Sequence, residues 1–431
     1  MAGSLRPDLL RQVWEYPLFD ALYGRRSRRF GLGFEMAEGP TPYQSHQSPA
    51  PLSEDEEALL VAAGVGFSGI ALWDQSRPLP GRFDGRTFAS PTRGRSSRLF
   101  FTNDRGVYLI DKTTSPALKM QTAETPDDRK TVLDLYRESR RELQPGRLGI
   151  PRRVPPLCGH NLWDSNMPGS TLFMPVCDVS LSLIALIAQF VDPRLGHFAL
   201  GGHGAYIVDD RQGLRPAGTE EWLRDGLLDE TKVLTLSHLE RQACYFTFSE
   251  PAVICHNMFL ATEAMGIGGW MHCGFLSREI FEVLGFRLEA PNGVAALAHP
   301  VGLDGVFEAY CPPYFATMDA AVDAVLTPLL RASWTAGDHS TGQQSSVPYL
   351  MTDAERREGC VEISAEGLAC TKAVCNYILG TYGRFPGTVD AMHLMWFLQA
   401  HHLDTGYYDG FFRRGAYGPT HAAHMKTWHG L

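Results

Sequence analysis

Two groups of side chains in this sequence have types and spacings that can do chemistry. The first is the run Arg25-Arg26-Ser27-Arg28-Arg29. Within it, Arg25, Ser27 and Arg29 are spaced two residues apart. Two guanidinium groups and one hydroxyl can then converge on a single anion, such as the terminal phosphate of a nucleotide-like cofactor, if the segment is extended or turns at a helix start. The run can equally be a solvated basic stretch without a ligand.

The second group is a concentration of histidines, six of the fifteen in the chain, between residues 393 and 431. One interpretation is a metal site, in which His401 or His402 joins Asp404, His421 and His424 as ligands of Zn, Fe or Mn. The segment lacks a compact H-x-x-x-H or H-E-x-x-H pattern, so our preferred prediction is that it holds no metal.

Two other interpretations of the histidine-rich segment stay open. It can be an aromatic docking tail whose imidazoles are satisfied by carbonyls and carboxylates. It can also form a wall of a substrate pocket, because its side chains combine apolar bodies with polar tips. We favour the pocket, and the residues that we predict to line it are Trp396, His401, His402, Tyr407 and Tyr408.

A glycine-rich connection follows a predicted helix at 256–265. The helix carries Asn257 and is predicted to end at Gly266, which is followed by Gly268 and Gly269. Glycines without Cβ allow the backbone to approach a flat ring or a phosphate closely. Taken alone, the run is a glycine-rich helix connection and nothing more.

Taken together, these stretches resemble the FMN-dependent nitroreductase-like superfamily, especially its longer branch that includes azoline dehydrogenases. That family opens with R-R-S-x-R and a capped helix, as RRSRRF (25–30) and PLSEDEEALLVAAG (51–64) do here. It later has a stretch that matches the chain at the following positions: Glu250, Asn257, Met258, Leu260, Gly266, Gly268, Phe275 and Leu284-Gly285. The segment 298–305 (AHPVGLDG) is similar to the closing strand of the family.

The resemblance implies an FMN-dependent oxidoreductase that transfers a hydride to or from a small organic molecule or a modified peptide. NAD(P)H or O₂ would be the co-substrate, and the family's flavin lies at a homodimer interface, which implies a homodimer. No catalytic side chain is implied. The residues implied to bind FMN are Arg25, Ser27, Arg29, Ser90, Asn257, Gly266, Gly268 and Gly269.

Two alternatives to a flavin enzyme stay open. His256 stands where the family has Gln, and residues 66–73 (GFSGIALW) lack both amides of the family's ring-edge element. These departures favour a flavin-free partner or scaffold subunit. The other alternative is a metal-dependent enzyme that uses the C-terminal histidines.

The elements that must position these residues favour the α+β class, because helices and strands interleave without a regular βαβ rhythm. We expect a nitroreductase-like domain at 1–330, with an antiparallel-rich central sheet flanked by helices and an insertion near 112–235. A polar linker is expected at 331–360 and a helical extension at 361–431, with a helix at 389–400. Strands are expected around the turn 103–106, in a second such pair at 197–208, and at 294–298. Ser53 and Glu56 are expected to form a capping box at the start of one helix, and Asp178 is expected to cap another.

Composition limits the remaining classes of function. The chain has 431 residues and a formal net charge of −9, which argues against general nucleic-acid binding. Nine scattered cysteines without a C-x-x-C pair favour a reducing compartment. The first residues do not form a secretory signal, and the most apolar segment, 171–191, is interrupted by Pro175 and Asp178. We therefore expect a cytoplasmic protein with no membrane partner.

Overall fold

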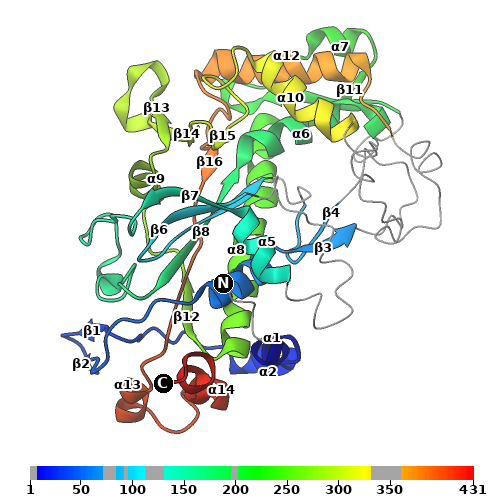
Figure 1. Cartoon of the computed structure of the whole chain (residues 1–431). Helices are drawn as coiled ribbons and strands as arrows, with labels where there is room; N and C mark the ends of the chain where they lie inside the picture. The colour runs from blue at the N-terminus through cyan, green and yellow to red at the C-terminus, as the bar shows by residue number, and fades with distance from the viewer. Residues whose placement is uncertain (1–6, 71–83, 92–95, 112–130, 196–201, 332–360) are drawn as a thin grey trace, which may run out of the picture.

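The computed structural model describes residues 7–70, 84–91, 96–111, 131–195, 202–331 and 361–431. Its class is α+β, as predicted, with helices around an antiparallel central sheet (Figure 1). The strand order is β12-β17-β8-β5-β6-β7, and a short strand, β16, also pairs with β8. The bounds are β5 (Ser97–Thr102), β6 (Gly106–Ile110), β7 (Arg140–Pro145), β8 (Thr171–Asp178), β12 (Gly268–His272), β16 (Met392–His393) and β17 (Phe397–His401).

The middle strands of this sheet are buried on both faces. Phe100 of β5 packs with Leu172 on one face, whereas Leu99 and Phe101 pack with Phe173 on the other. Since alternate side chains of a strand point to opposite faces, two covered faces require an almost continuous apolar run. The predicted pair of strands around the turn 103–106 is confirmed as β5 and β6.

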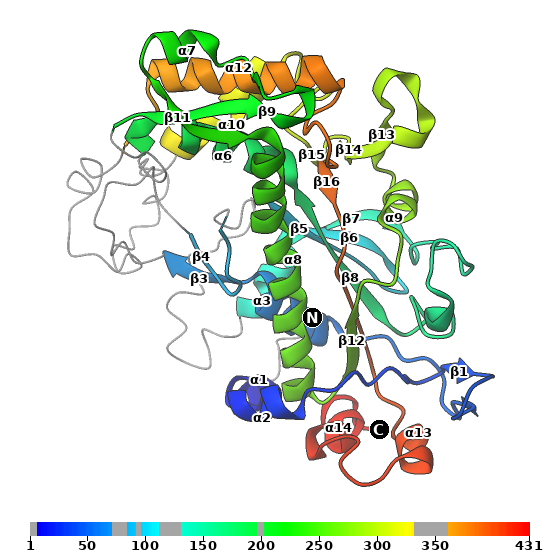
Figure 2. The ribbon, with the colours of Figure 1, turned by 180° about the vertical axis from the view of Figure 1, so that it is seen from behind.

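One long helix, α8 (Leu236–Met265), crosses the back of the central sheet (Figure 2). The hydroxyl of Thr235 caps its first turn, and Gly266 ends it with a left-handed φ of 80°. The predicted helix stop at Gly266 is therefore confirmed, although the helix begins well before the predicted residue 256. Pro251 lies inside α8, where a proline usually ends a helix.

A smaller layer packs beyond one end of the central sheet. It contains the three-stranded sheet β10-β9-β11 and four helices (Figure 1). Their bounds are β9 (Gly204–Asp209), β10 (Arg215–Pro216), β11 (Leu228–Thr235), α6 (Val179–Val191), α7 (Glu220–Arg224), α10 (Met318–Arg331) and α12 (Ala365–Tyr382). The cap that we predicted at Asp178 is confirmed, because its carboxylate accepts bonds from the amides of Ser180 and Leu181. Of the pair of strands predicted at 197–208, the second is confirmed as β9, which pairs with β10 and β11, and the first falls on residues outside the described part.

The opposite end of the molecule brings together elements from both ends of the sequence (Figures 1 and 2). These are α1 (Pro7–Trp14), α2 (Leu18–Gly24), β1 (Glu35–Met36), β2 (Tyr43–Gln44), α13 (Thr405–Phe411), α14 (Pro419–His424) and a π-helical turn at Met425–His429. The remaining elements are α3 (Glu54–Val65), β3 (Phe67–Ile70), β4 (Asp84–Arg86), α5 (Thr131–Ser139), α9 (Ser277–Leu284), β13 (Arg287–Glu289), β14 (His299–Leu303) and β15 (Phe307–Glu308).

The predicted helix at 389–400 is wrong, because these residues form β16 and β17. β17 lies between β12 and β8, so all five of its residues are buried and no amphipathic period marks it as a strand. The predicted strand at 294–298 is also wrong, since short 3₁₀ turns precede β14 there. Residues 112–235, the expected insertion, contribute β7 and β8 to the central sheet. Residues 332–360, almost all of the expected linker, lie outside the described part.

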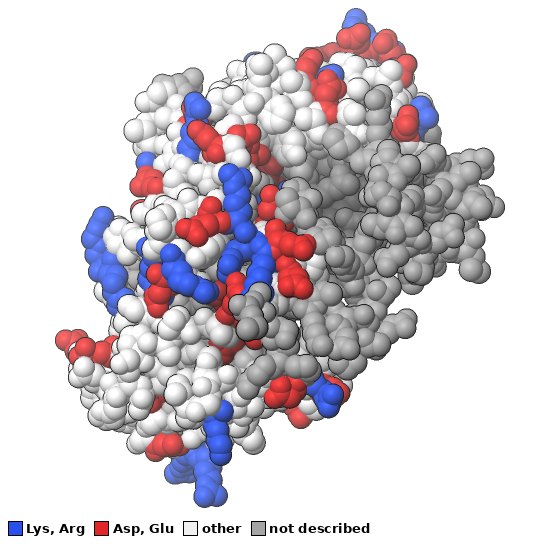
Figure 3. All heavy atoms as spheres, viewed as in Figure 1, with Lys and Arg blue, Asp and Glu red and all other residues white. Residues whose placement is uncertain are grey.

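Charged side chains of both signs are interspersed on the face drawn in Figure 3. Opposite charges also pair among the described residues: Arg137 and Arg140 both pair with Glu54, at 2.5 and 3.0 Å. The described residues of this face therefore present no broad surface of one sign. No helix in the described ranges is both long enough and apolar enough to span a membrane.

Candidate metal centre

The first residue of the site is Glu56, in the first turn of α3. Its Oε2 accepts a bond from the amide of Ser53 at 2.5 Å, while the Ser53 hydroxyl accepts one from the amide of Glu56 at 3.3 Å. This capping box was predicted from the sequence and is confirmed. The capping box uses only Oε2. The second oxygen, Oε1, of the fully buried Glu56 therefore remains for other partners.

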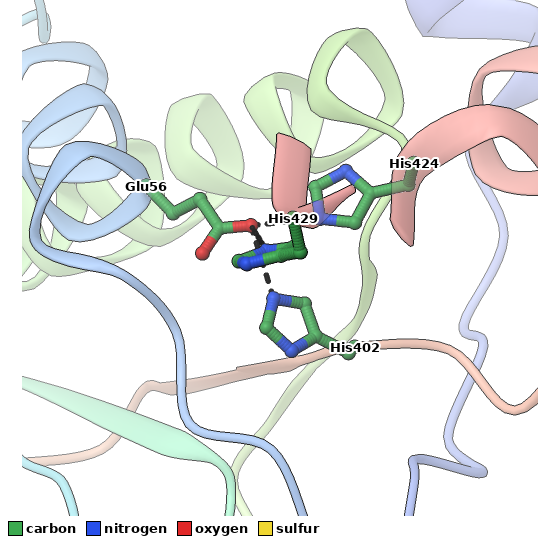
Figure 4. A group of neighbouring side chains, drawn as sticks. All are labelled: Glu56, His402, His424 and His429. Atoms are coloured by element: carbon green, nitrogen blue, oxygen red, sulfur yellow. Dashed lines mark hydrogen bonds and ion pairs between the residues drawn. The ribbon is translucent and has the colours of Figure 1, made fainter. Parts of the chain in front are cut away.

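Three imidazoles converge on that second oxygen (Figure 4). The Nε2 atoms of His402, His424 and His429 lie 3.0, 2.7 and 3.1 Å from Glu56 Oε1. His402 directly follows β17, His424 ends α14, and His429 ends the π-helical turn. We call these four residues the Glu56 cluster.

The spacing within the Glu56 cluster is that of a metal-ligand set. Its four ligand atoms all lie within 4.8 Å of one another. Four nitrogen and oxygen ligands at about 2.0–2.1 Å from one ion in a tetrahedral arrangement are about 3.3 Å apart. The contacts of 2.7–3.1 Å between the imidazoles and Glu56 Oε1 are close to that separation, and the four atoms, all within 4.8 Å of one another, would have to adjust to surround one ion.

The outer ring nitrogens show why a cation fits between these side chains. His402 Nδ1 lies 3.0 Å from the carbonyl of Ala50, and His424 Nδ1 lies 2.8 Å from the carbonyl of Met265. A carbonyl can only accept, so each Nδ1 must carry a hydrogen. In a neutral imidazole, Nε2 then presents a lone pair to the carboxylate of Glu56, which is also an acceptor.

Two charge states remove this clash between acceptors. Both rings can become imidazolium cations, but the side chains of His402 and His424 are only 1% and 2% exposed, and gathering such charges without water is costly. Alternatively, neutral rings and the carboxylate can share one metal cation. Histidine ligands usually donate their outer N–H to a carbonyl or carboxylate, as both rings do here.

The carboxylate is suited to be the anionic ligand. Burial acts to raise the pKa of Glu56, but the facing imidazoles, His402 foremost, outweigh it and hold that pKa well below its ordinary value. That lowering comes from imidazoles that are charged or that donate to the carboxylate; between neutral rings that present lone pairs, the shared cation would keep Glu56 ionised. Three imidazoles and one carboxylate are a donor set that suits first-row divalent metals such as Zn and Fe.

The metal ligands considered from the sequence are only partly brought together. His402 and His424 belong to the Glu56 cluster, whereas His401 points to the opposite side of the chain, as consecutive residues of a strand do. His421 Nε2 lies 3.9 Å from a carboxylate oxygen of Glu263. Asp404 instead caps α13 through the amide of Tyr407. Burial lowers the pKa of both His401 and His421 to about 3, so each is neutral.

The predicted pocket residues lie in different places. Tyr407 stacks on Phe30 with ring centroids 4.3 Å apart, and the hydroxyl of Tyr408 accepts the amide of Phe30. His401 is near this group, with its ring 5.1 Å from that of Phe34. Trp396 packs instead against the core beside α8, and His402 faces Glu56. The five residues therefore do not share one wall.

The side chains predicted to bind FMN are mostly engaged within the chain. Arg29 donates to both carboxylate oxygens of Asp164 at 2.5 and 2.9 Å. Asn257 donates to the carbonyl of Thr87, and Ser90 donates to Glu250. Two others are exposed: Ser27, and Arg25, whose guanidinium lies 5.1 Å from the ring centroid of Phe259.

The predicted glycines lie against other parts of the same chain. A Cβ on Gly266 would be 2.3 Å from the carbonyl oxygen of Thr420, and one on Gly268 would be 2.7 Å from Nε2 of His401. The carbonyl of Gly269 accepts the amide of Arg28. The close approach that these glycines permit is therefore made by the chain itself, and within one chain these residues do not fit FMN.

Sequence reasoning missed three important residues. Glu56 was recognised only as a cap, and His429 was not placed in the ligand set. Arg28 was passed over in the RRSRR run, yet it is the arginine that is buried, paired with Glu263 at 2.5 Å and bonded to the carbonyl of Ala416 at 2.8 Å. The capping pattern and the histidine count were the signals, but neither shows which side chains converge.

Comparison with known proteins does not assign this chain to a family. No family model and no curated protein matches the sequence. A 2.00 Å crystal structure from Ralstonia eutropha JMP134, described as a candidate nitroreductase, is similar over 62% of this chain and 75% of its own, at 14% identity. The TM-score is 0.29, and a likeness at that level carries no argument about cofactor or activity.

Proposed function

We propose that this protein is a metal-dependent enzyme whose centre is one divalent first-row transition-metal ion held by the Glu56 cluster. The observation that carries the proposal is the pair of carbonyl-bound Nδ1 atoms on His402 and His424. These bonds fix the tautomer in which both Nε2 lone pairs face the Glu56 carboxylate, an arrangement that a shared cation stabilises.

The donor set supports a catalytic rather than a purely structural ion. Structural zinc sites are mostly built from cysteine, alone or with histidine. Catalytic sites use three protein ligands, such as three histidines or two histidines and a glutamate, and keep a fourth position open; the Glu56 cluster contains such a set and one further histidine. The chain has nine cysteines, yet none belongs to the Glu56 cluster. When bound, the ion would supply Lewis acidity or redox chemistry.

The residues of this chain would hold and orient the ion. Glu56 supplies the negative charge, and the carbonyls of Ala50 and Met265 fix the rings of His402 and His424. Glu56 lies in α3, His402 follows β17, and His424 and His429 end α14 and the turn after it. The ion would therefore also join segments that are 346 to 373 residues apart in the sequence.

Metal analysis of purified variants tests the proposal. We expect His402→Ala to lose the ion, because it removes a buried ligand. His160→Ala is the matched control: His160 is exposed and lies outside the Glu56 cluster, so this variant should keep its metal. Equal metal content in the two variants would refute the assignment of His402.

An FMN-dependent oxidoreductase that uses NAD(P)H or O₂ is a second candidate, and its support is the exposed pair Arg25 and Ser27. Arg29 would first have to leave Asp164 before it could hold a phosphate, and a homodimer would have to supply the rest of the flavin site. The visible spectrum of the purified protein tests this candidate. A colourless protein that takes up no FMN would exclude it.

A further inference from the structure

The four residues of the Glu56 cluster are not anchored equally. Besides its contact inside the cluster, Glu56 is held by the amide of Ser53 at 2.5 Å. His402 and His424 are held through Nδ1 by carbonyl oxygens at 3.0 and 2.8 Å. His429 has only its Nε2 contact with Glu56, and its Nδ1 has no partner among the residues that the structure describes.

His429 is also the ligand on the solvent side. Its side chain is 22% exposed, compared with 2% or less for each of the other three. It ends a π-helical turn and is followed by Gly430, which has a left-handed φ of 71°. Single π-helical turns occur frequently at functional sites.

The ring of His429 can therefore move without leaving a buried polar atom unsatisfied. Its ring neighbours within the cluster are the two other imidazoles, with centroids 4.6 Å away for His402 and 5.5 Å away for His424. Since its Nδ1 already lacks a protein partner, rotating the ring outward costs only the Nε2 contact. The same movement of His402 or His424 would also break a buried hydrogen bond to a carbonyl.

We propose that Glu56, His402 and His424 are a permanent two-histidine, one-carboxylate triad and that His429 is an exchangeable fourth ligand. Its departure opens a coordination position on the solvent side for a small anionic donor, such as hydroxide or the carboxylate of a small substrate. Such triads leave several metal positions open. This inference rests on the proposed function, because it requires the ion in the Glu56 cluster.

Cobalt(II) is the probe, since its visible bands report coordination number. The metal-free protein and its variants are loaded with Co²⁺, passed through a gel-filtration column and titrated with azide. We expect His429→Ala to keep about one cobalt per chain, whereas His402→Ala loses it. Azide should shift the bands of His429→Ala at a concentration about tenfold lower than in the unaltered protein. Added imidazole should restore the original spectrum by filling the position of the missing ring.

The outcomes separate this inference from the proposed function. If His429→Ala loses cobalt as completely as His402→Ala does, or if azide does not shift its bands, the inference that His429 is exchangeable is refuted and the proposed function is not. An unaltered protein that binds no cobalt would overturn both. If circular dichroism shows that His429→Ala is unfolded, His429→Gln answers the same question with a side chain of closer size, and His160→Ala should behave as the unaltered protein does.

Discussion

Glu56→Gln separates the two roles of this side chain. Glutamine can replace glutamate in a capping box, so the bond between the side chain and the amide of Ser53 is kept. The charge that faces the three imidazoles is lost. We expect the variant to fold but to bind metal far more weakly, and therefore to lose the stabilisation that an ion gives the folded chain.

The size of that stabilisation follows from mass action. The ligands are 346 to 373 residues apart from Glu56, so the unfolded chain has no preformed site and the binding free energy favours the folded state alone. At a free metal concentration about 100 times Kd, this amounts to about 2.7 kcal/mol. Unfolding entropy of about 2.1 cal/mol/K per residue gives about 0.9 kcal/mol/K for 431 residues, so Tm rises by about 3 °C.

Calorimetry with excess Zn²⁺ and with a chelator measures this shift. Glu54→Gln is the matched control, because it lies in the same helical turn but pairs with Arg137 at the surface. Such surface pairs contribute little to stability, so this variant should keep the whole metal-dependent shift. An equal shift in Glu56→Gln and the unaltered protein would refute the role of Glu56.

Three further predictions concern the scaffold. Burial raises the pKa of Asp178 to about 7, against about 3.9 when unfolded. The folded state therefore holds a proton that the unfolded state releases between these values, and stability falls as pH rises. From pH 5 to pH 8 the free energy of unfolding should fall by about 3 kcal/mol relative to that of Asp178→Asn, whose side-chain oxygen can still cap α6. Urea denaturation at each pH measures both proteins, and the same dependence on pH in the two would contradict this. Gly266→Ala should be more destabilising than Gly226→Ala in the same assay. Both glycines have φ near 80°, but a Cβ at Gly266 would also meet Thr420, whereas Gly226 has open space; equal losses would contradict the close contact. Arg28→Met leaves Glu263 buried without its partner and should lower the free energy of unfolding, measured by urea denaturation, by about 3–5 kcal/mol. The double variant Arg28→Met/Glu263→Gln should lower it by less. A double variant as unstable as the sum of its parts would refute the pairing.

Local signals in the sequence predicted local structure well. The capping box at Ser53, the cap at Asp178 and the left-handed stop at Gly266 each depend on residues within one turn, and all three are confirmed. The strands β5 and β6 were found because a short turn separates them. In each case, the residues that decide the structure are neighbours in the chain.

Features that depend on distant residues could not be predicted in this way. The sequence of β17 does not identify it as a strand, because burial on both faces removes the alternation that marks one. The Glu56 cluster joins the first turn of α3 to residues more than 340 positions away, and no spacing in the sequence records that contact. The RRSRR run likewise does not show that Arg28, and not Arg29, is the buried arginine.

Metal content measured together with X-ray absorption on the purified protein tests the central claim most directly. We expect about one divalent transition-metal ion per chain, with nitrogen and oxygen ligands at about 2.0–2.2 Å and the outer-shell scattering of imidazole. Glu56→Gln and His402→Ala should contain far less metal than the unaltered protein. Only trace metal in protein loaded with Zn²⁺, Fe²⁺ or Co²⁺, or a first shell that contains sulfur, would contradict the assignment of the Glu56 cluster.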